Sequence, residues 1–219
     1  MDDIRRWQKP DEKVCFVTFN YDTLLEEALR YADYPFTELS AYIARDLMLV
    51  KLHGSVNWAR IVNTPVDELL GLERTDLAKQ LIDRYQKLDI SKQFVMVGEY
   101  PPSPRNKKAV FPALAIPVEA KLDFECPPEH IEALKAFIPE VRKILMIGWR
   151  ATEQPFLDLL KRGLGQANPH IMVVNGATTE GEAAATNVRR SGIPARYTIV
   201  DGGFTQFTVR GAGTEFLSG

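Results

Sequence analysis

The sequence predicts a mixed α/β protein with a doubly wound, mostly parallel sheet, and two observations indicate this fold class. The first is a set of short apolar runs without polar alternation, which is typical of strands buried on both faces. The second is that most of these runs are followed by apolar residues at helical spacing, and alternating strands and helices build such a sheet. The expected strands are residues 14–17, 47–50, 144–147 and 171–174, with a weaker fifth at 197–200.

Three helices are expected after these strands. They are predicted around residues 24–32, 156–164 and 180–190. In the first, Glu26 and Arg30 are spaced to form an outward-facing i,i+4 pair. The third is rich in alanine, and Gly192 and Pro194 are typical of the end of a helix.

The middle of the chain has a different pattern. Residues 61–92 predict one or two polar helices, with the clearest helical pattern over residues 76–82. Residues 100–108 predict an exposed flap, because their prolines cannot occupy the interior of a sheet. We therefore expect one domain over residues 1–219 with an insertion or small lobe at about residues 61–125.

Composition excludes several classes of protein. The 219 residues are 45% hydrophobic and 26% charged, with a formal net charge of −2, which gives no sign of a nucleic-acid-binding surface. No apolar run approaches the roughly 18 residues of a membrane span, and the charged start of the chain does not resemble a signal peptide. A cytoplasmic protein that binds neither nucleic acid nor membrane is expected.

The residues that most often bind zinc are few. Cys15 and Cys126 are the two cysteines, and neither belongs to a C-x-x-C pair. Two free thiols in a reducing compartment, and no four-cysteine zinc site, are therefore expected. His130, in the first turn of an expected helix, and His170, just before a strand, are predicted to be structural.

Polar residues follow the first two predicted strands where each strand ends. The first strand leads into Thr18, Asn20 and Asp22, and the second into Lys51-Leu52-His53-Gly54-Ser55. Ligands of open α/β sheets bind beyond the carboxyl ends of the strands, so both sets are candidates for a site. An amide there can hold ribose hydroxyls or a water, and an imidazole with a pKa of about 6.5 can accept a proton.

Structural roles for these residues remain alternatives. Asn20 and Asp22 are also suited to cap the following helix, and Thr23-x-x-Glu26 has the spacing of a capping box. His53 has the alternative role of a hydrogen-bonded histidine in a turn.

These segments together resemble the sirtuin-like (SIR2-like) family, in the zinc-free form found in bacteria. Residues 18–22 (T-F-N-Y-D) resemble its T-x-N-x-D motif, and residues 51–55 (K-L-H-G-S) resemble its K-L-H-G-S motif. Three weaker similarities are residues 144–149, like the strand and glycine that contact NAD, residues 173–175, like the strand-end asparagine near the adenosine, and residues 203–207, like the closing helix. The resemblance implies a Rossmann-like, DHS-like NAD-binding fold.

The resemblance also implies cleavage of the bond between nicotinamide and ribose in NAD. By analogy Asn20 would hold the nicotinamide ribose or order the attacking water, His53 would act as general base, and Asp22 would shape the nicotinamide side. NAD is then a substrate, and no zinc is needed. The NAD-binding residues implied in the same way are Thr18, Gly54, Ser55, Gly148, Arg150 and Asn175.

The chain departs from the family pattern in three places. The zinc-ribbon cysteines of the protein deacylases are absent, which favours an NAD hydrolase over a deacylase. Where the family often has Gly-x-Ser and a nearby Asp, this chain has residues 148–154 (G-W-R-A-T-E-Q). Either Arg150 reaches a phosphate or Glu153 lies in the first turn of the next helix.

The third departure concerns the phosphate-binding segment of the family, a strand, a G-A-G loop and a helix. Residues 1–13 cannot form this unit, and we expect it to be missing from the N-terminus. Residues 211–213 (G-A-G) match it in letters alone, because too little chain follows to form the supporting helix. If the first strand is missing, an open sheet edge is expected to associate with a second copy or a partner chain.

Three functions follow from the resemblance. The first is an NAD hydrolase (NADase), of a type used in bacterial defence. The second is a non-catalytic module that binds NAD or ADP-ribose, or serves as a scaffold, which the missing phosphate loop favours. The third, a protein deacylase, is the least supported.

Overall fold

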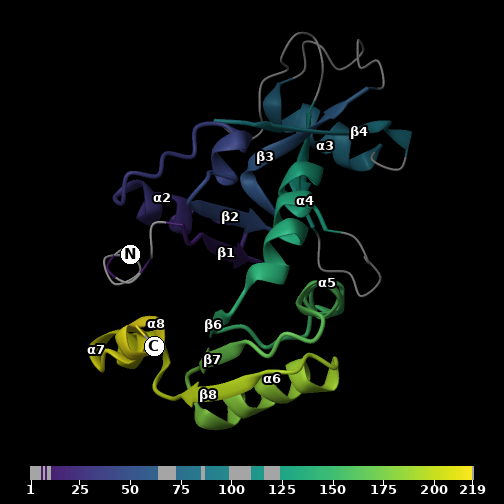
Figure 1. Ribbon diagram of the computed structural model, residues 1–219. Helices are drawn as coiled ribbons and strands as arrows, with labels where there is room; N and C mark the ends of the chain where they lie inside the picture. The colour runs from purple at the N-terminus through teal and green to yellow at the C-terminus, as the bar shows by residue number, and fades with distance from the viewer. Residues whose placement is uncertain are drawn as a thin grey trace. The chain divides into compact units, whose positions relative to one another are not determined.

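The computed structural model describes residues 6, 8, 11–63, 73–84, 87–98, 110–115 and 124–218 (Figure 1). The chain divides into two compact units. The N-terminal unit is Lys13–Ile131, and the C-terminal unit is Glu132–Gly219 together with Met1–Glu12.

A two-stranded parallel sheet lies at the base of the N-terminal unit. Strand β1 (Val14–Thr18) pairs with β2 (Leu47–Lys51) in a register that runs from Val14 opposite Leu47 to Thr18 opposite Lys51. All five residues of β2 are buried. The two apolar runs predicted to be strands are confirmed.

The helix that follows β1 is α2 (Leu24–Arg30), and its buried face differs from the prediction. Glu26 is not turned outward but is buried, and its carboxylate lies 2.8 Å from the ammonium of Lys51. Leu24 is 68% exposed. The predicted i,i+4 pair with Arg30 is wrong, because a fully buried cation on the neighbouring strand attracts the carboxylate into the core. Thr23 makes no capping hydrogen bond with its side chain, so the predicted capping box is also wrong.

The middle of the chain forms an antiparallel sheet where polar helices were expected. Strands β3 (Gly54–Val62), β4 (Ile90–Met96) and β5 (Val110–Leu114) pair in the order β4-β3-β5. Helix α3 (Arg74–Asp83) confirms the helical pattern, but residues at both ends of 61–92 are in strands. The error arose because cross-strand pairing, and not local periodicity, decides these segments. The predicted flap at 100–108 lies outside the described residues.

An aromatic cluster fills the core of the N-terminal unit. Tyr42, from the 3-10 helix η1 (Leu39–Tyr42), lies 5.1 Å from the ring of Trp58 and 5.7 Å from that of His130. All three side chains are almost completely buried. His130, in the first turn of α4 (Pro128–Phe137), lies 2.8 Å through Nε2 from the carbonyl of Leu39. The structural role predicted for His130 is thereby confirmed.

The buried imidazole of His130 makes the stability of the protein depend on pH. Burial lowers its pKa from the ordinary 6.5, although the Leu39 carbonyl and the Glu129 carboxylate act in the opposite direction. Above about pH 6.5 the ring is neutral in the folded and the unfolded chain, so this group adds no pH dependence. Below that pH only the unfolded chain takes up the proton, so the free energy of unfolding falls by at most about 1.4 kcal/mol per pH unit.

Urea unfolding at pH 7.0 and 5.5 measures this fall. A His130→Asn variant is expected to lose less stability between the two pH values than the wild type, whatever its stability at pH 7. His170→Asn, in the other unit, serves as the control and is expected to keep the wild-type difference. An unchanged pH dependence in His130→Asn would contradict the prediction.

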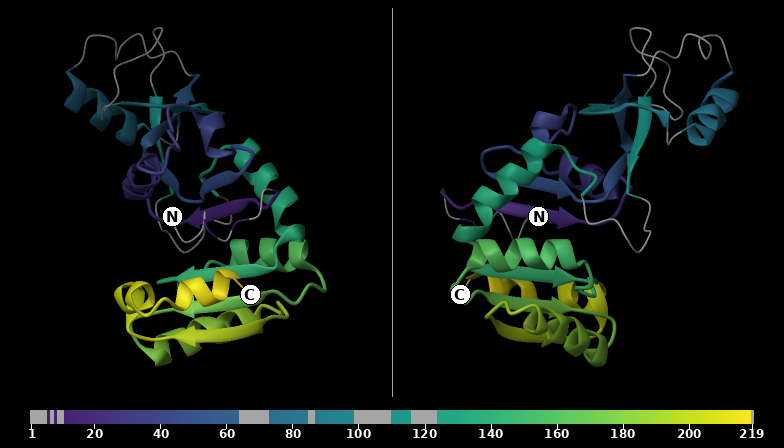
Figure 2. Two further views of the ribbon diagram at one scale, coloured as in Figure 1. Left: turned by 60° about the vertical axis from the view of Figure 1, so that its left-hand side comes forward. Right: turned by 90° about the vertical axis from the view of Figure 1, so that its right-hand side faces the viewer.

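The C-terminal unit is a parallel sheet with helices on both faces (Figure 2). Its strands pair in the order β6-β7-β8, and its elements include η4 (Ile138–Glu140), β6 (Lys143–Ile147), α5 (Gln154–Leu164), β7 (His170–Val174), α6 (Thr178–Arg190), β8 (Arg196–Val200), α7 (Gly203–Val209) and α8 (Ala212–Ser218). On one face Met172 and Val174 pack against Phe207 of α7 and Phe216 of α8. On the other face Val173 approaches α6 at Gly181.

This alternation confirms the predicted α/β class with parallel sheets, and β6, β7 and β8 confirm the last three predicted strands. The two later helices are confirmed as α5 and α6. The G-A-G letters at 211–213 have a packing role, because a Cβ atom on Gly213 would lie 2.7 Å from the ring of Phe207. His170 accepts or donates a 2.8 Å hydrogen bond with the hydroxyl of Thr198, in agreement with the predicted structural role.

Both cysteines are free thiols, as predicted. Burial raises the pKa of Cys15 to about 12 and also raises that of Cys126 well above its ordinary value. The thiols therefore stay protonated at neutral pH. Among the helices in the described part of the chain, none has the length and apolar character that crossing a membrane requires.

Candidate functional site

The predicted site begins where β1 and β2 end. Thr18 and Lys51 are paired in register, and the amide of Leu52 donates a 3.0 Å hydrogen bond to the carbonyl of Thr18. Asn20 and His53 each follow their strand at the same offset from this pair. Because the two strands are parallel, both residues lie beyond the same edge of the sheet.

His53 is half-buried between aromatic neighbours. Its ring centroid lies 5.1 Å from that of Phe19 in an edge-on contact and 6.3 Å from that of Tyr21 in a stacked one. The Tyr21 hydroxyl donates a 2.9 Å hydrogen bond to the carbonyl of Ala115, whose amide donates to the carbonyl of His53 at 2.9 Å. The backbone and one face of the imidazole are therefore fixed by groups from two other segments of the chain.

Asn20 and Asp22 are both exposed on the loop after β1. The backbone amide of Asn20 donates to the hydroxyl of Thr18 at 3.1 Å, which folds the loop back on the strand. Asp22 Oδ1 accepts a 3.1 Å hydrogen bond from the amide of Leu24 at the start of α2. This contact agrees with the local structural role of Asp22, and a role beside the nicotinamide stays a prediction.

Gly54 and Ser55 are buried. Gly54 has φ of +85°, and a Cβ atom there would lie 1.8 Å from the carbonyl oxygen of Ala113. The hydroxyl of Ser55 donates a 3.3 Å hydrogen bond to the carbonyl of Tyr21. Both residues therefore shape the backbone of the site, and NAD contacts for them stay predictions.

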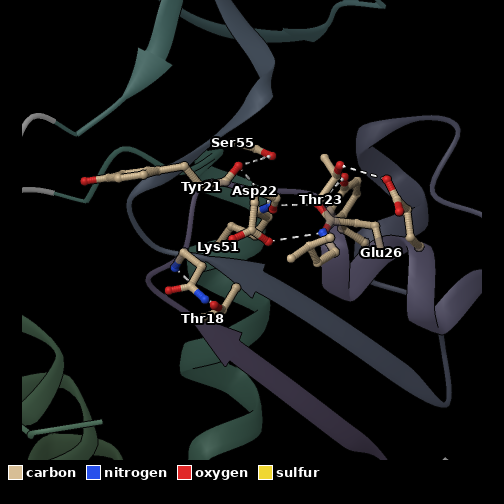
Figure 3. A network of polar contacts seen from close by, with 11 residues as sticks. Thr18, Tyr21, Asp22, Thr23, Glu26, Lys51 and Ser55 are labelled. Carbon is tan, nitrogen blue, oxygen red and sulfur yellow. Dashed lines mark hydrogen bonds and ion pairs between the residues drawn. The ribbon is translucent and has the colours of Figure 1, made fainter. Parts of the chain in front are cut away.

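Sequence reasoning missed Lys51 as an important residue of this site. Its side chain is fully buried and contacts Glu26 and the backbone of the loop after β1 (Figure 3). A signal was present in the sequence, since a lysine ends an apolar run that otherwise predicts a strand buried on both faces.

The predicted site residues of the C-terminal unit also follow strand ends. Gly148 follows β6, and its amide donates to the carbonyl of Val174 at 3.0 Å. Asn175 follows β7 and is buried, and its backbone carbonyl accepts a 2.9 Å hydrogen bond from the backbone amide of Gly203. Among the described residues, the Oδ1 atom of Asn175 has no hydrogen-bond partner. A buried acceptor of this kind is suited to a ligand donor.

The loop after β6 contains Arg150 and Glu153, the residues of the two earlier alternatives. Glu153 lies directly before α5, and its carboxylate accepts hydrogen bonds from the indole of Trp149 and, at 3.2 Å, from the amide of Thr152. It therefore orders the loop locally. The side chain of Arg150 is exposed, while its carbonyl accepts a 3.0 Å hydrogen bond from Asn187 of α6. A phosphate contact for Arg150 stays a prediction.

A shallow depression of about 600 Å³ lies elsewhere in the C-terminal unit, between the ends of α5 and α6. It is lined by Lys161, Gly165, Gln166, Arg189 and residues 192–195. None of the predicted site residues borders it, and ligands of open α/β sheets bind at the carboxyl ends of the strands instead. No group of three or more potential metal-ligating side chains occurs in the described ranges.

Parallel strands with polar residues at their carboxyl ends define a Rossmann-like α/β protein with the general layout of a nucleotide-binding domain. The chain belongs to the family of SIR2-like domains, whose model matches residues 14–193. This membership relates the chain to NAD. No curated protein and no solved structure matches it.

Proposed function

We propose that this protein hydrolyses NAD at the bond between nicotinamide and ribose. The observation that supports the proposal most is the common position of Asn20 and His53 beyond the paired ends of β1 and β2. An amide that binds hydroxyl groups and an imidazole that accepts protons are both suited to this hydrolysis. Membership of the SIR2-like family supplies the relation to NAD.

The chemistry assigned to these residues is simple. The bond between C1′ of the ribose and the nicotinamide nitrogen breaks, and the electron pair leaves with nicotinamide. A water attacks C1′, and His53 takes its proton, so that NAD and water give nicotinamide, ADP-ribose and a proton. Asn20 holds the ribose or orients the water, which lowers the entropic cost of the attack.

Positive charge develops on the ribose as nicotinamide leaves. A neutral imidazole and fixed amide dipoles stabilise this charge without reorganisation. In this scheme Asp22 acts through its place in the loop, since its carboxylate accepts the amide of Leu24. Besides Gly54 and Ser55, the residues proposed to contact NAD are Thr18, Gly148, Arg150 and Asn175.

Incubation of the purified chain with NAD tests the proposal, with free nicotinamide and ADP-ribose measured by chromatography. Equal amounts of the two products, formed in proportion to protein, are expected. NAD or ADP-ribose binding by calorimetry without product would instead indicate a non-catalytic binding module. Nicotinamide released only with an acyl-lysine peptide, together with O-acyl-ADP-ribose, would indicate a deacylase. If the chain neither binds NAD or ADP-ribose nor turns NAD over, the roles of hydrolase, NAD-binding module and deacylase are all excluded.

Three accompanying features are part of the proposal. They are a cytoplasmic location, independence of zinc and a role in bacterial defence. Turnover that persists in the presence of a strong chelator is the result expected for a zinc-free enzyme.

A further inference from the structure

Lys51 is a buried cation at the last position of an otherwise apolar strand. Its side chain is 0% exposed. Its ammonium lies 2.8 Å from Glu26 Oε1, contacts the carbonyl of Asp22, and lies 3.5 Å from the carbonyl of Tyr21 (Figure 3). An ammonium has three N–H donors, so these acceptors match its full capacity.

Ser55 reaches the same loop from the other side of the turn between β2 and β3. It is 0% exposed, and its hydroxyl donates to the carbonyl of Tyr21 at 3.3 Å. The amide of Val56 donates to that carbonyl at 2.9 Å. The first and the last residues of the K-L-H-G-S segment, Lys51 and Ser55, therefore both bind the backbone of the loop that carries Asn20.

The carboxylate of Glu26 connects this arrangement to the rigid core. Its Oε1 atom also accepts a 3.2 Å hydrogen bond from the hydroxyl of Tyr42, which is completely buried. Burial and the Glu26 carboxylate raise the pKa of Tyr42 well above its ordinary value, so the phenol stays protonated and donates. The ring of Tyr42 is in turn fixed against Trp58.

Stability alone does not explain a lysine at this position. Removing an ammonium from water is costly, and a well-packed apolar residue in place of a buried ion pair is often neutral or stabilising. What an apolar residue cannot supply is a donor to the carbonyls of Tyr21 and Asp22. The unusual feature of Lys51 is thus that it donates hydrogen bonds to the loop that follows the neighbouring strand, β1.

We propose that Lys51, assisted by Ser55, is a positioning residue that holds the backbone of residues 19–23 so that Asn20 stays beyond the end of β1 beside the turn that carries His53. Its effect on catalysis rests on the proposed NAD hydrolysis, whereas its effect on the loop does not. The K-L-H-G-S segment then has two roles, with His53 for chemistry and its two end residues for geometry.

A double variant, Lys51→Met with Glu26→Gln, tests the proposal. It removes both buried charges, so no unpaired ion remains, and we expect a melting temperature within about 3 °C of the wild type. Hydrogen exchange followed by mass spectrometry is expected to show amides in residues 19–23 exchanging about 10-fold faster. In the NAD assay kcat is expected to fall about 100-fold while KM changes less than about threefold.

Two single variants serve as controls. Glu26→Gln keeps the ammonium against the loop carbonyls but leaves it without a charged partner, so it is expected to lower the melting temperature while exchange in residues 19–23 rises less than in the double variant. Arg60→Met removes a cation of the same unit that binds the carbonyl of Ser91 and the carboxylate of Glu125, remote in sequence from this loop. It is expected to leave both the loop exchange and kcat unchanged.

Wild-type exchange rates in residues 19–23 of the folded double variant would overturn the proposal, because Lys51 would then be only a charge partner of Glu26. If the double variant does not fold, Ser55→Ala provides the second test, with an expected increase in loop exchange of about threefold. Unchanged exchange in Ser55→Ala would then overturn the proposal. A wild-type protein that does not hydrolyse NAD refutes the proposed function, while the exchange measurements still decide the role of Lys51.

Discussion

A Gly54→Ala variant is expected to lose about 3 kcal/mol or more of unfolding free energy. The added Cβ atom would lie 1.8 Å from the carbonyl oxygen of Ala113 and 2.8 Å from its carbon. These are backbone atoms of β5, opposite Gly54 in the antiparallel sheet, so no side chain can rotate away to make room. The φ of +85° adds a conformational penalty for any residue with a Cβ atom.

Gly165→Ala is the matched control for this experiment. Gly165 has φ of +56°, yet its Cβ position meets no atom within 4 Å. It therefore isolates the penalty of an unfavourable backbone conformation, expected to be about 1–3 kcal/mol because its ψ of −118° lies outside the left-handed helical region. Urea unfolding followed by circular dichroism gives both values. A Gly54→Ala protein no less stable than Gly165→Ala would show that β5 can move aside.

The second large effect is expected for His53→Ala, whose turnover of NAD should fall at least about 100-fold, the typical contribution of a general base. The dissociation constant for NAD should change less than about threefold, because a neutral imidazole acts on the water or the ribose hydroxyl as the bond breaks. Nicotinamide release measures the first quantity and calorimetry measures the second.

His170→Ala serves as the control for His53→Ala. His170 is half-buried like His53, but it lies on β7 against Thr198 and Phe216. The turnover of NAD by the His170→Ala variant is expected to stay close to the wild-type value. A His53→Ala protein that folds normally and loses affinity for NAD together with turnover would contradict the role of general base and indicate a binding role.

The contrast between the confirmed strands and the missed ones has a physical cause. Runs such as 47–50 and 171–174 are apolar at every position, because strands of a covered parallel sheet are buried on both faces. Strand β4 (Ile90–Met96) is only partly buried, and its middle residues are exposed. It exists because Trp58 and Ala59 of β3 pair with Met96 and Val95, and no local periodicity records such a partner.

The site shows the same division. The order of Asn20 and His53 after two apolar strands is readable along the chain, and the parallel register brings both to one edge. The capping box was predicted from spacing alone and is wrong, because the Glu26 side chain forms an ion pair in the core instead. Its partner, Lys51, lies on a different strand, so the competition between the two pairings is a tertiary effect.

The order of apolar runs and helical patterns by itself determined the α/β class, and the motifs at residues 18–22 and 51–55 indicated the family and the candidate residues. Those features are local, because burial and turn chemistry leave their record in adjacent residues. Only the tertiary structure decided which groups meet: the ammonium of Lys51 contacts the loop after β1, and Gly54 lies so close to the Ala113 carbonyl that a Cβ atom does not fit. Such contacts join segments distant along the chain, and desolvation and close packing, which depend on the surroundings in space, set their energies.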